Sequence, residues 1–172
     1  MDAFELGPHD IGPALLRPLS SANAAPLGEA LAAIPPWSTI NWPASRLAAT
    51  LKNWPVGVRR FELLVEGELA GTVSIQFPFL YGPYLQLLAV LPGFQGRGLG
   101  LACLEWMERE ARAAEARQLW LCVTSYNTGA RAFYERFGFK EAALLDKLAT
   151  DVSDEVFMRK RLSYPRPNLT PA

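Results

Sequence analysis

A strand that ends in a glycine-rich turn and leads directly into a helix constrains this chain more than any other feature. The segment runs Leu88-Ala-Val-Leu-Pro-Gly-Phe-Gln-Gly-Arg-Gly-Leu-Gly100. Its glycines permit a tight turn and keep side chains out of the way of a ligand. The first turn of the helix offers backbone N–H groups without intrahelical partners, at the positive end of the helix dipole. The turn therefore favours a phosphate or pyrophosphate ligand over the alternative of a tight turn that binds nothing.

Neither of the two common nucleotide motifs fits this turn. The P-loop motif G-x-x-x-x-G-K-[ST] requires a lysine that does not follow these glycines. The dinucleotide fingerprint G-x-G-x-x-G matches Gly96 and Gly98, but Leu101 occupies its third glycine position. The sequence thus argues against both of these ligand classes and leaves another phosphate-bearing ligand open.

The elements expected around the turn form a mixed sheet with helices packed on it, which is an α/β (α+β) fold. Apolar residues at spacings of three and four support the helix after the turn, and a glycine between two apolar runs supports a hairpin. In chain order we expect helices at 22–34 and 44–53, strands at 61–65, 69–76 and 84–90, a helix at 98–114, a strand at 118–123, a helix at 128–136, and strands at 141–147 and 155–162. Residues 1–162 are expected to form one domain, followed by a proline-rich tail at 163–172.

The composition excludes several classes of function. Seventeen basic residues balance seventeen acidic ones, so nothing indicates a nucleic-acid or membrane partner, although a local basic patch is compatible with this balance. Cys103 and Cys122 form no CxxC pair, and the single histidine, His9, is expected at the surface, so we predict no metal site. No secretory signal and no membrane span is expected, and the predicted location is cytoplasmic.

A second motif follows the strand at 118–123 and narrows the choice. Asn127, Ala130, Tyr134, Gly138 and Phe139 fit the pattern N-x-x-A-x-x-x-Y-x-x-x-G-F without a gap. Together with Gln95-x-x-Gly98-x-Gly100, this pattern resembles the GNAT superfamily, the Gcn5-related N-acetyltransferases. The resemblance extends from about Phe61 to Leu162 and is faint before that.

The resemblance implies a fold, a cofactor and a set of site residues. In this family the sheet is mixed, mostly antiparallel and splayed at the cofactor cleft, and the strand before the turn carries a bulge. Acetyl-CoA is the implied donor, and its pantetheine arm would pair with Leu88, Ala89 and Val90. Its pyrophosphate would meet backbone N–H groups of Gln95, Gly96, Arg97, Gly98, Leu99, Gly100 and Leu101. Asn127 would hydrogen-bond the arm beside Ala130, and Tyr134 would protonate the departing thiolate, unless it is a core aromatic with a satisfied hydroxyl.

The general base is not identified by these motifs. Relatives that acetylate protein N-termini often carry a glutamate where this chain has Cys122, which we interpret as a small hydrophobic residue, and Gln86 cannot act as a base. The remaining possibilities are water or a carboxylate, although each candidate carboxylate is more readily explained as a solvated surface charge than as a base. The candidates are Glu62, Glu66, Asp146, Asp151 and Asp154.

The first 57 residues are expected to be helical and to form the acceptor side. Trp37 and Trp42 would provide an aromatic wall for the acceptor, or would simply pack the helices onto the sheet. The predicted function is direct transfer of an acetyl group to the amine of a small molecule or peptide. The alternatives are a catalytically silent module that binds coenzyme A or an acyl-CoA, and a purely structural domain. Many members of this family are dimers, so a homodimer is one expectation.

Overall fold

The computed structural model describes residues 3–163, so almost all of the expected tail at 163–172 lies outside the described residues. Eight strands form one sheet in the order β1-β2-β3-β4-β5-β6-β8-β7. Their bounds are β1 His9–Asp10, β2 Leu15–Pro18, β3 Val58–Val65, β4 Glu68–Phe79, β5 Gly82–Val90, β6 Gln118–Thr124, β7 Lys140–Thr150 and β8 Ser153–Arg161. All neighbours pair antiparallel except β5 and β6, which confirms the expected mixed, mostly antiparallel sheet.

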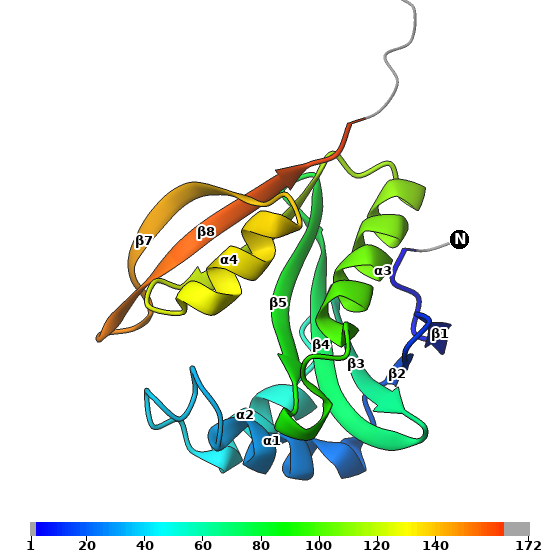
Figure 1. The fold of residues 1–172 in the computed structure, drawn as a ribbon, viewed down its shortest axis with the longest axis vertical. Coiled ribbons are helices and arrows are strands. Elements are labelled where there is room, and N and C mark those ends of the chain that lie inside the picture. The colour runs from blue at the N-terminus through cyan, green and yellow to red at the C-terminus, as the bar shows by residue number, and fades with distance from the viewer. Residues whose placement is uncertain (1–2, 164–172) are drawn as a thin grey trace, which may run out of the picture.

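Four α-helices flank this sheet, and they lie close to the predicted ranges. They are α1 Ala24–Ala32, α2 Ala44–Lys52, α3 Leu99–Ala113 and α4 Thr128–Arg136. In Figure 1, α1 and α2 lie together at one end of β5, whereas α3 and α4 stand on either side of its length. Short 3-10 turns at Ser21–Asn23 and Pro92–Phe94 precede α1 and the glycine turn.

Two hydrophobic clusters cover opposite faces of β5. Ala89 belongs to the cluster made with α1 and α2, while Leu88 and Val90 pack against the larger cluster that contains α3. Successive strand residues point to opposite faces, which explains the division. β5 therefore lies between α1 and α2 on one face and the main cluster with α3 on the other, and it packs against both.

The prediction that residues 1–57 are helical is wrong for the segment before α1. β2 pairs antiparallel with β3, with Leu16 opposite Leu63, and β1 pairs with β2. Leu16 is fully buried in the main cluster. His9 is also not an ordinary surface residue, because its ring centroid lies 5.5 Å from that of Phe61 and 5.3 Å from that of Trp106. Short strands of this kind form through long-range pairing, which local patterns do not reveal.

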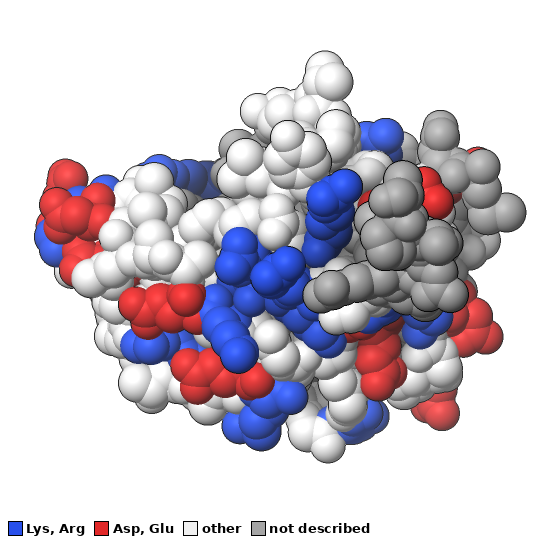
Figure 2. All heavy atoms as spheres, turned by 90° about the horizontal axis from the view of Figure 1, so that it is seen from above, with Lys and Arg blue, Asp and Glu red and all other residues white. Residues whose placement is uncertain are grey.

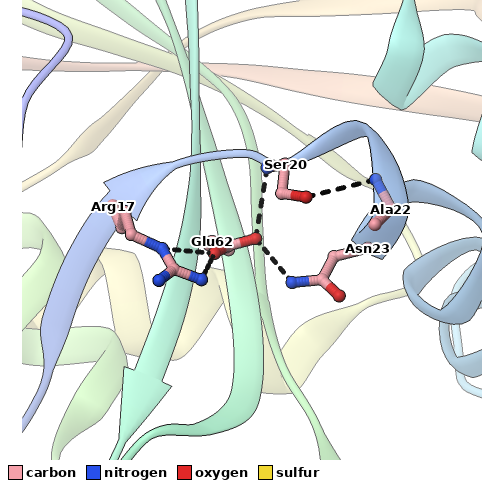
Figure 3. A network of polar contacts seen from close by, with 5 residues as sticks. All are labelled: Arg17, Ser20, Ala22, Asn23 and Glu62. Carbon is pink, nitrogen blue, oxygen red and sulfur yellow. Dashed lines mark hydrogen bonds and ion pairs between the residues drawn. The ribbon is translucent and has the colours of Figure 1, made fainter.

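A buried carboxylate joins β3 to the start of the N-terminal helices (Figure 3). Glu62 is fully buried and forms an ion pair with Arg17. Its other oxygen accepts hydrogen bonds from the Ser20 N–H at 3.2 Å and from Asn23 Nδ2 at 2.8 Å. Every oxygen of this carboxylate therefore has a protein partner, and Glu62 holds the segment that leads into α1.

Charged side chains are distributed unevenly over the surface. Seen from above, from the end of the molecule away from α1 and α2, Lys and Arg side chains gather near the centre of the face with acidic side chains around them (Figure 2). A local basic patch thus coexists with a balanced total charge. Within residues 3–163, no helix is long and apolar enough to cross a membrane, and no group of three metal-binding side chains occurs.

Candidate active site

β5 and β6 separate from each other, and this separation opens the centre of the sheet. They pair at only two positions, Tyr84 with Trp120 and Leu85 with Leu121. On the other side of β5, Leu85 and Leu87 face consecutive residues of β4, so Gln86 has no partner and forms a bulge. The bulge bends β5 away from β6 beyond Leu85, as the splayed sheet predicted from the sequence requires.

A cavity of about 400 Å³ occupies this opening. Its walls come from β5, β6, α4, the loop between α1 and α2, and the segment from the end of β7 to the start of β8. Nine of the predicted site residues line it, namely Trp37, Trp42, Leu88, Ala89, Val90, Gln95, Asn127, Ala130 and Tyr134. The structure thus brings both halves of the predicted site to one place.

The glycine turn lies beside the cavity and ends at an uncapped helix. Gly96 and Gly98 both have φ of 76°, in the left-handed region that glycine adopts without strain. Gly98 is the N-cap of α3 and supplies no side-chain cap, and a Cβ atom built on it would meet nothing within 4 Å. The first N–H groups of α3 are therefore not covered by a capping side chain, which fits an anionic ligand.

Other residues of the turn make contacts within the protein that stabilise the turn and the packing of α3. Gln95 Nε2 donates to the Val90 carbonyl at 2.9 Å, and Arg97 Nη2 donates to the Gly93 carbonyl at 3.0 Å. A Cβ atom on Gly100 would lie 3.3 Å from the Phe133 ring, so a glycine there lets α3 approach α4. Six predicted residues lie next to the cavity rather than in its wall, namely Gly96, Arg97, Gly98, Leu99, Gly100 and Leu101.

Asn127 begins α4 at the edge of the cavity. Its Oδ1 accepts a hydrogen bond from the Ala130 N–H at 3.2 Å, which caps the helix. Within residues 3–163, its Nδ2 makes no hydrogen bond. The side chain thus fixes the start of α4 with one atom and leaves a donor for a ligand in the cavity.

Tyr134 lies about two turns further along α4 and also lines the cavity. Its ring centroid is 5.2 Å from that of Phe133 and 5.9 Å from that of Phe139, so the ring is held by packing. No hydrogen bond of the hydroxyl occurs among the described residues. Burial, together with a smaller contribution from Cys103, raises the pKa of Tyr134 to about 12, so the phenol keeps its proton at neutral pH.

The other half of the cavity is apolar and aromatic. It is lined by Trp37, Ile40, Trp42 and Leu148. Both tryptophans also pack against the α1–α2 cluster, so each of them lines the cavity and packs the helices onto the sheet. The Arg46 guanidinium lies 4.2 Å from the centre of the Trp42 ring. A second hollow of about 540 Å³ shares Ile40, Trp42 and residues 148–150 with the cavity and continues to the surface.

None of the five carboxylates proposed from the sequence lines the cavity. Glu62 is buried elsewhere, Asp151 lines the outer hollow, and Asp154 is paired with Lys147 at 2.7 Å. A sixth carboxylate, Glu155, does line the cavity and was not among the candidates. It stands opposite Thr124 in the β6–β8 ladder, and the β8 pattern could have indicated it only once that long-range register was known.

Cys122 occupies the wall of the cavity beside Tyr84. The side chain is half-buried, and burial raises the pKa of its thiol, so the thiol is protonated at neutral pH. This agrees with a small hydrophobic residue and argues against a nucleophile. Gln86, at the bulge, also lines the cavity and carries an uncharged amide.

Comparison with known proteins decides the family. A model of the acetyltransferase (GNAT) family matches residues 29–139, which include the bulged strand, the glycine turn, Asn127 and Tyr134. The chain belongs to the GNAT family. Members of this family use acetyl-CoA, and the uncapped start of α3 and the splayed β5 of this chain fit that ligand.

Several GNAT relatives are similar to this chain. The [ribosomal protein bS18]-alanine N-acetyltransferase of Escherichia coli strain K12 is 37% identical over 84 residues, 49% of this chain and 56% of the relative. An aminoalkylphosphonate N-acetyltransferase of Salmonella typhimurium is 34% identical over 84 residues, 46% of this chain and 54% of the relative. The chain therefore spans about half the length of the curated relatives that it matches.

Solved structures match over more of the chain. The crystal structure of the Escherichia coli ribosomal-protein-S18-alanine N-acetyltransferase has a TM-score of 0.67 at 28% identity and covers 90% of this chain and 97% of that one. A ribosomal L7/L12 α-N-protein acetyltransferase in complex with coenzyme A has a TM-score of 0.72 at 15% identity, with 90% and 98% covered. The second likeness concerns the fold alone.

Proposed function

We propose that this chain is an N-acetyltransferase that moves the acetyl group of acetyl-CoA directly to an amine. The observation that carries the proposal is the position of Tyr134. Tyr134 lines the cavity between the separated strands, and its hydroxyl keeps its proton at neutral pH and has no hydrogen bond among residues 3–163. A proton donor of this kind is what a departing thiolate needs.

The donor half of the cavity fits the parts of coenzyme A. Residues 88–90 lie on β5 beyond its last pairing with β6, so their backbone groups on that side can pair with the amides of a pantetheine arm. The start of α3 and the two glycines with positive φ suit the pyrophosphate. Nδ2 of Asn127 is a further donor at the edge of the arm's path.

The residues of the cavity support transfer without an acyl-enzyme. Bound acetyl-CoA supplies a thioester carbonyl, and an N–H group of the bulged strand can stabilise negative charge as it develops on the carbonyl oxygen. Tyr134 donates its proton to the leaving sulfur. Cys122 remains a neutral thiol because burial raises its pKa, and it is therefore a poor alternative nucleophile.

The acceptor enters from the opposite half. The relatives named above act on a ribosomal-protein alanine and on aminoalkylphosphonates, so both a peptide amine and a small-molecule amine are acceptor classes to consider. The outer hollow continues from Trp42 to the surface past Arg46, and it gives room for an acceptor that extends beyond its amine.

The test is release of free thiol from acetyl-CoA in the presence of a panel of primary amines and short peptides. We expect thiol release that depends on the amine and rises with protein concentration. Binding of acetyl-CoA without release for any acceptor would instead indicate a coenzyme A sensor. Equal release with and without amines would indicate hydrolysis of the thioester, and either result would contradict the proposal.

A further inference from the structure

We propose that Glu155 binds the acceptor as an ammonium ion and takes its proton, and that the acceptor carries no anionic group next to its amine. The inference rests on the proposed function and adds to it the missing proton acceptor and the acceptor class. It depends on three observations, which are the position of Glu155, its lack of an internal counter-charge, and the charges of the cavity.

Glu155 lies where the register of two strands brings it to the cavity. It is directly opposite Thr124, and Cys122 is opposite Phe157, in the antiparallel pairing of β6 with β8. Directly opposite residues share a face of the sheet, and so do residues two apart in one strand. Glu155 therefore shares the face of Cys122, and β8 brings its carboxylate to the wall of the cavity.

The two buried glutamates of the sheet differ in their partners. Glu62 is paired with Arg17 and accepts hydrogen bonds from Ser20 and Asn23. Glu155 is 7% exposed and has no ion pair within residues 3–163. The Thr124 side chain hydrogen-bonds its carboxylate, and the uncharged Tyr84 and Cys122 side chains lie close enough to interact with it electrostatically. Burying an ionised carboxylate without a counter-charge costs free energy, and a bound cation from outside the protein would offset this cost.

The cavity provides no other charge. Among the described residues that line it, Glu155 is the one carboxylate and none is Lys, Arg, His or Asp; the other titratable groups are Tyr84, Cys122 and Tyr134. The remaining walls near Glu155 include Trp37, Ile40 and Leu148. An ammonium with apolar neighbouring atoms is compatible with this lining. A carboxylate or phosphonate beside the amine would be desolvated against a like charge. Arg46 and Lys147 line the outer hollow and not this cavity, so neither offsets that charge beside Glu155.

The electrostatics of the site suit a proton acceptor. Burial raises the pKa of Glu155, and the interaction with Thr124 offsets part of this increase. The ionised carboxylate is therefore a stronger base than an exposed glutamate. Tyr84 and Cys122 face it from β5 and β6, and burial raises the pKa of both, so neither competes as an anion at neutral pH.

The proton balance of the transfer is complete with these groups. The ammonium loses one proton to Glu155, which leaves a neutral amine with a free electron pair. That pair forms the C–N bond as the C–S bond breaks, and Tyr134 gives its proton to the sulfur. The second proton lost by the nitrogen restores Tyr134, and Glu155 releases its proton to solvent. One amide, one thiol and one free proton result.

The experiment uses the full 172-residue chain and two matched probes. Phenylalaninamide and phenylalanine share an aromatic body and an α-amine and differ in the carboxylate. Calorimetry in saturating coenzyme A measures the binding of each probe, and thiol release from acetyl-CoA measures turnover. The variants are Glu155→Gln, Glu155→Asp and, as a control, Glu66→Gln, which changes an exposed carboxylate in the β3–β4 turn.

We expect phenylalaninamide to bind the parent protein at least tenfold more tightly than phenylalanine. Glu155→Gln should bind phenylalaninamide about tenfold or more weakly and should lower kcat by about 10² to 10⁴. In the parent, the acid limb of the pH profile of kcat/KM should report a pKa above the ordinary range of a glutamate, and this limb should be absent from Glu155→Gln. Glu155→Asp should recover part of both losses, and Glu66→Gln should match the parent.

Three results would overturn the inference. They are equal binding of the two probes, no binding of phenylalaninamide to the parent, and a Glu155→Gln variant with the parent's rate and pH profile. Thermal melting distinguishes a structural role of Glu155 from a role in acceptor binding and proton transfer. Because its raised pKa means that the ionised carboxylate destabilises the fold, the Glu155→Gln variant should melt no lower than the parent. If phenylalaninamide bound in a way that depends on Glu155 but was never acetylated, the result would contradict the proposed function and still support an ammonium-binding site at Glu155.

Discussion

Asn23 Nδ2 donates a hydrogen bond of 2.8 Å to Glu62 Oε2, across 39 residues of sequence, and so fixes the start of the N-terminal helices to β3. Glu62→Gln removes the charge that also pairs with Arg17. We expect this variant to lose about 1–3 kcal/mol of unfolding free energy, because donors that served a carboxylate are left with a weaker partner. Urea denaturation measures the loss. Glu66→Gln, at an exposed position, should stay within about 0.5 kcal/mol, and equal losses in both variants would contradict the network's role.

The same carboxylate predicts a pH dependence of stability. Burial alone would raise the pKa of Glu62, but the contacts with Asn23, Arg17 and Ser20 outweigh it and lower the pKa below 4.5. Its stabilising contribution is therefore fully present above the unfolded value and is lost as pH falls through the folded pKa. The difference in stability between the parent and Glu62→Gln should be constant near neutral pH and shrink under acid. A difference that grows under acid would show the sign to be wrong.

Gly98→Val should separate the ligand-binding role of the turn from its backbone strain. Gly98 and Gly67 both have positive φ, and a Cβ atom on either meets nothing within 4 Å. Each valine variant should lose about 1–2 kcal/mol of stability from the left-handed backbone. Only Gly98→Val places a branched side chain at the start of α3, so it alone should weaken coenzyme A binding, by about tenfold or more. Titration calorimetry with both variants checks this, and equal affinities would remove the turn from the binding site.

Tyr134→Phe should lower kcat by about 10² to 10⁴ while the affinity for acetyl-CoA changes little. Phenylalanine keeps the ring in contact with Phe133 and Phe139, and the hydroxyl is needed only as the C–S bond breaks. Steady-state kinetics and a binding titration measure the two quantities. Tyr81→Phe, at a largely exposed tyrosine, is the matched control. A Tyr134→Phe variant with the parent's kcat would make Tyr134 a packing residue only.

Acetyl-CoA should raise the melting temperature of the chain, and NAD or ATP should not. At a hundred times its dissociation constant, a ligand that binds only the folded state adds about 2.7 kcal/mol of stability. The glycine turn lacks the third glycine and the lysine of the two nucleotide motifs, which is the physical basis for this selectivity. A shift with NAD or ATP but none with millimolar acetyl-CoA would contradict the proposed donor.

Much of the fold could be predicted because its signals are local. The glycines before α3, the apolar spacing along that helix and the Asn127 to Tyr134 motif each lie within one short segment, and their elements form close to the predicted residues. The sequence did not predict strand β2 or the position of Glu155 in the cavity wall, and the reason is the same for both. Both depend on which strand lies next to which, and a residue's neighbour across a ladder is not encoded in its own segment.

The backbones of β5 and β6 meet from the Tyr81–Arg117 hydrogen bond to the Leu85–Leu121 pair, and beyond Leu85 the two halves of the sheet are not paired with each other. Amide hydrogens along the open margin of each half should exchange rapidly with solvent until a ligand that carries amides of its own bridges the gap. The substrate would then act as a temporary strand, and the resistance of the chain to proteases would rise with its supply.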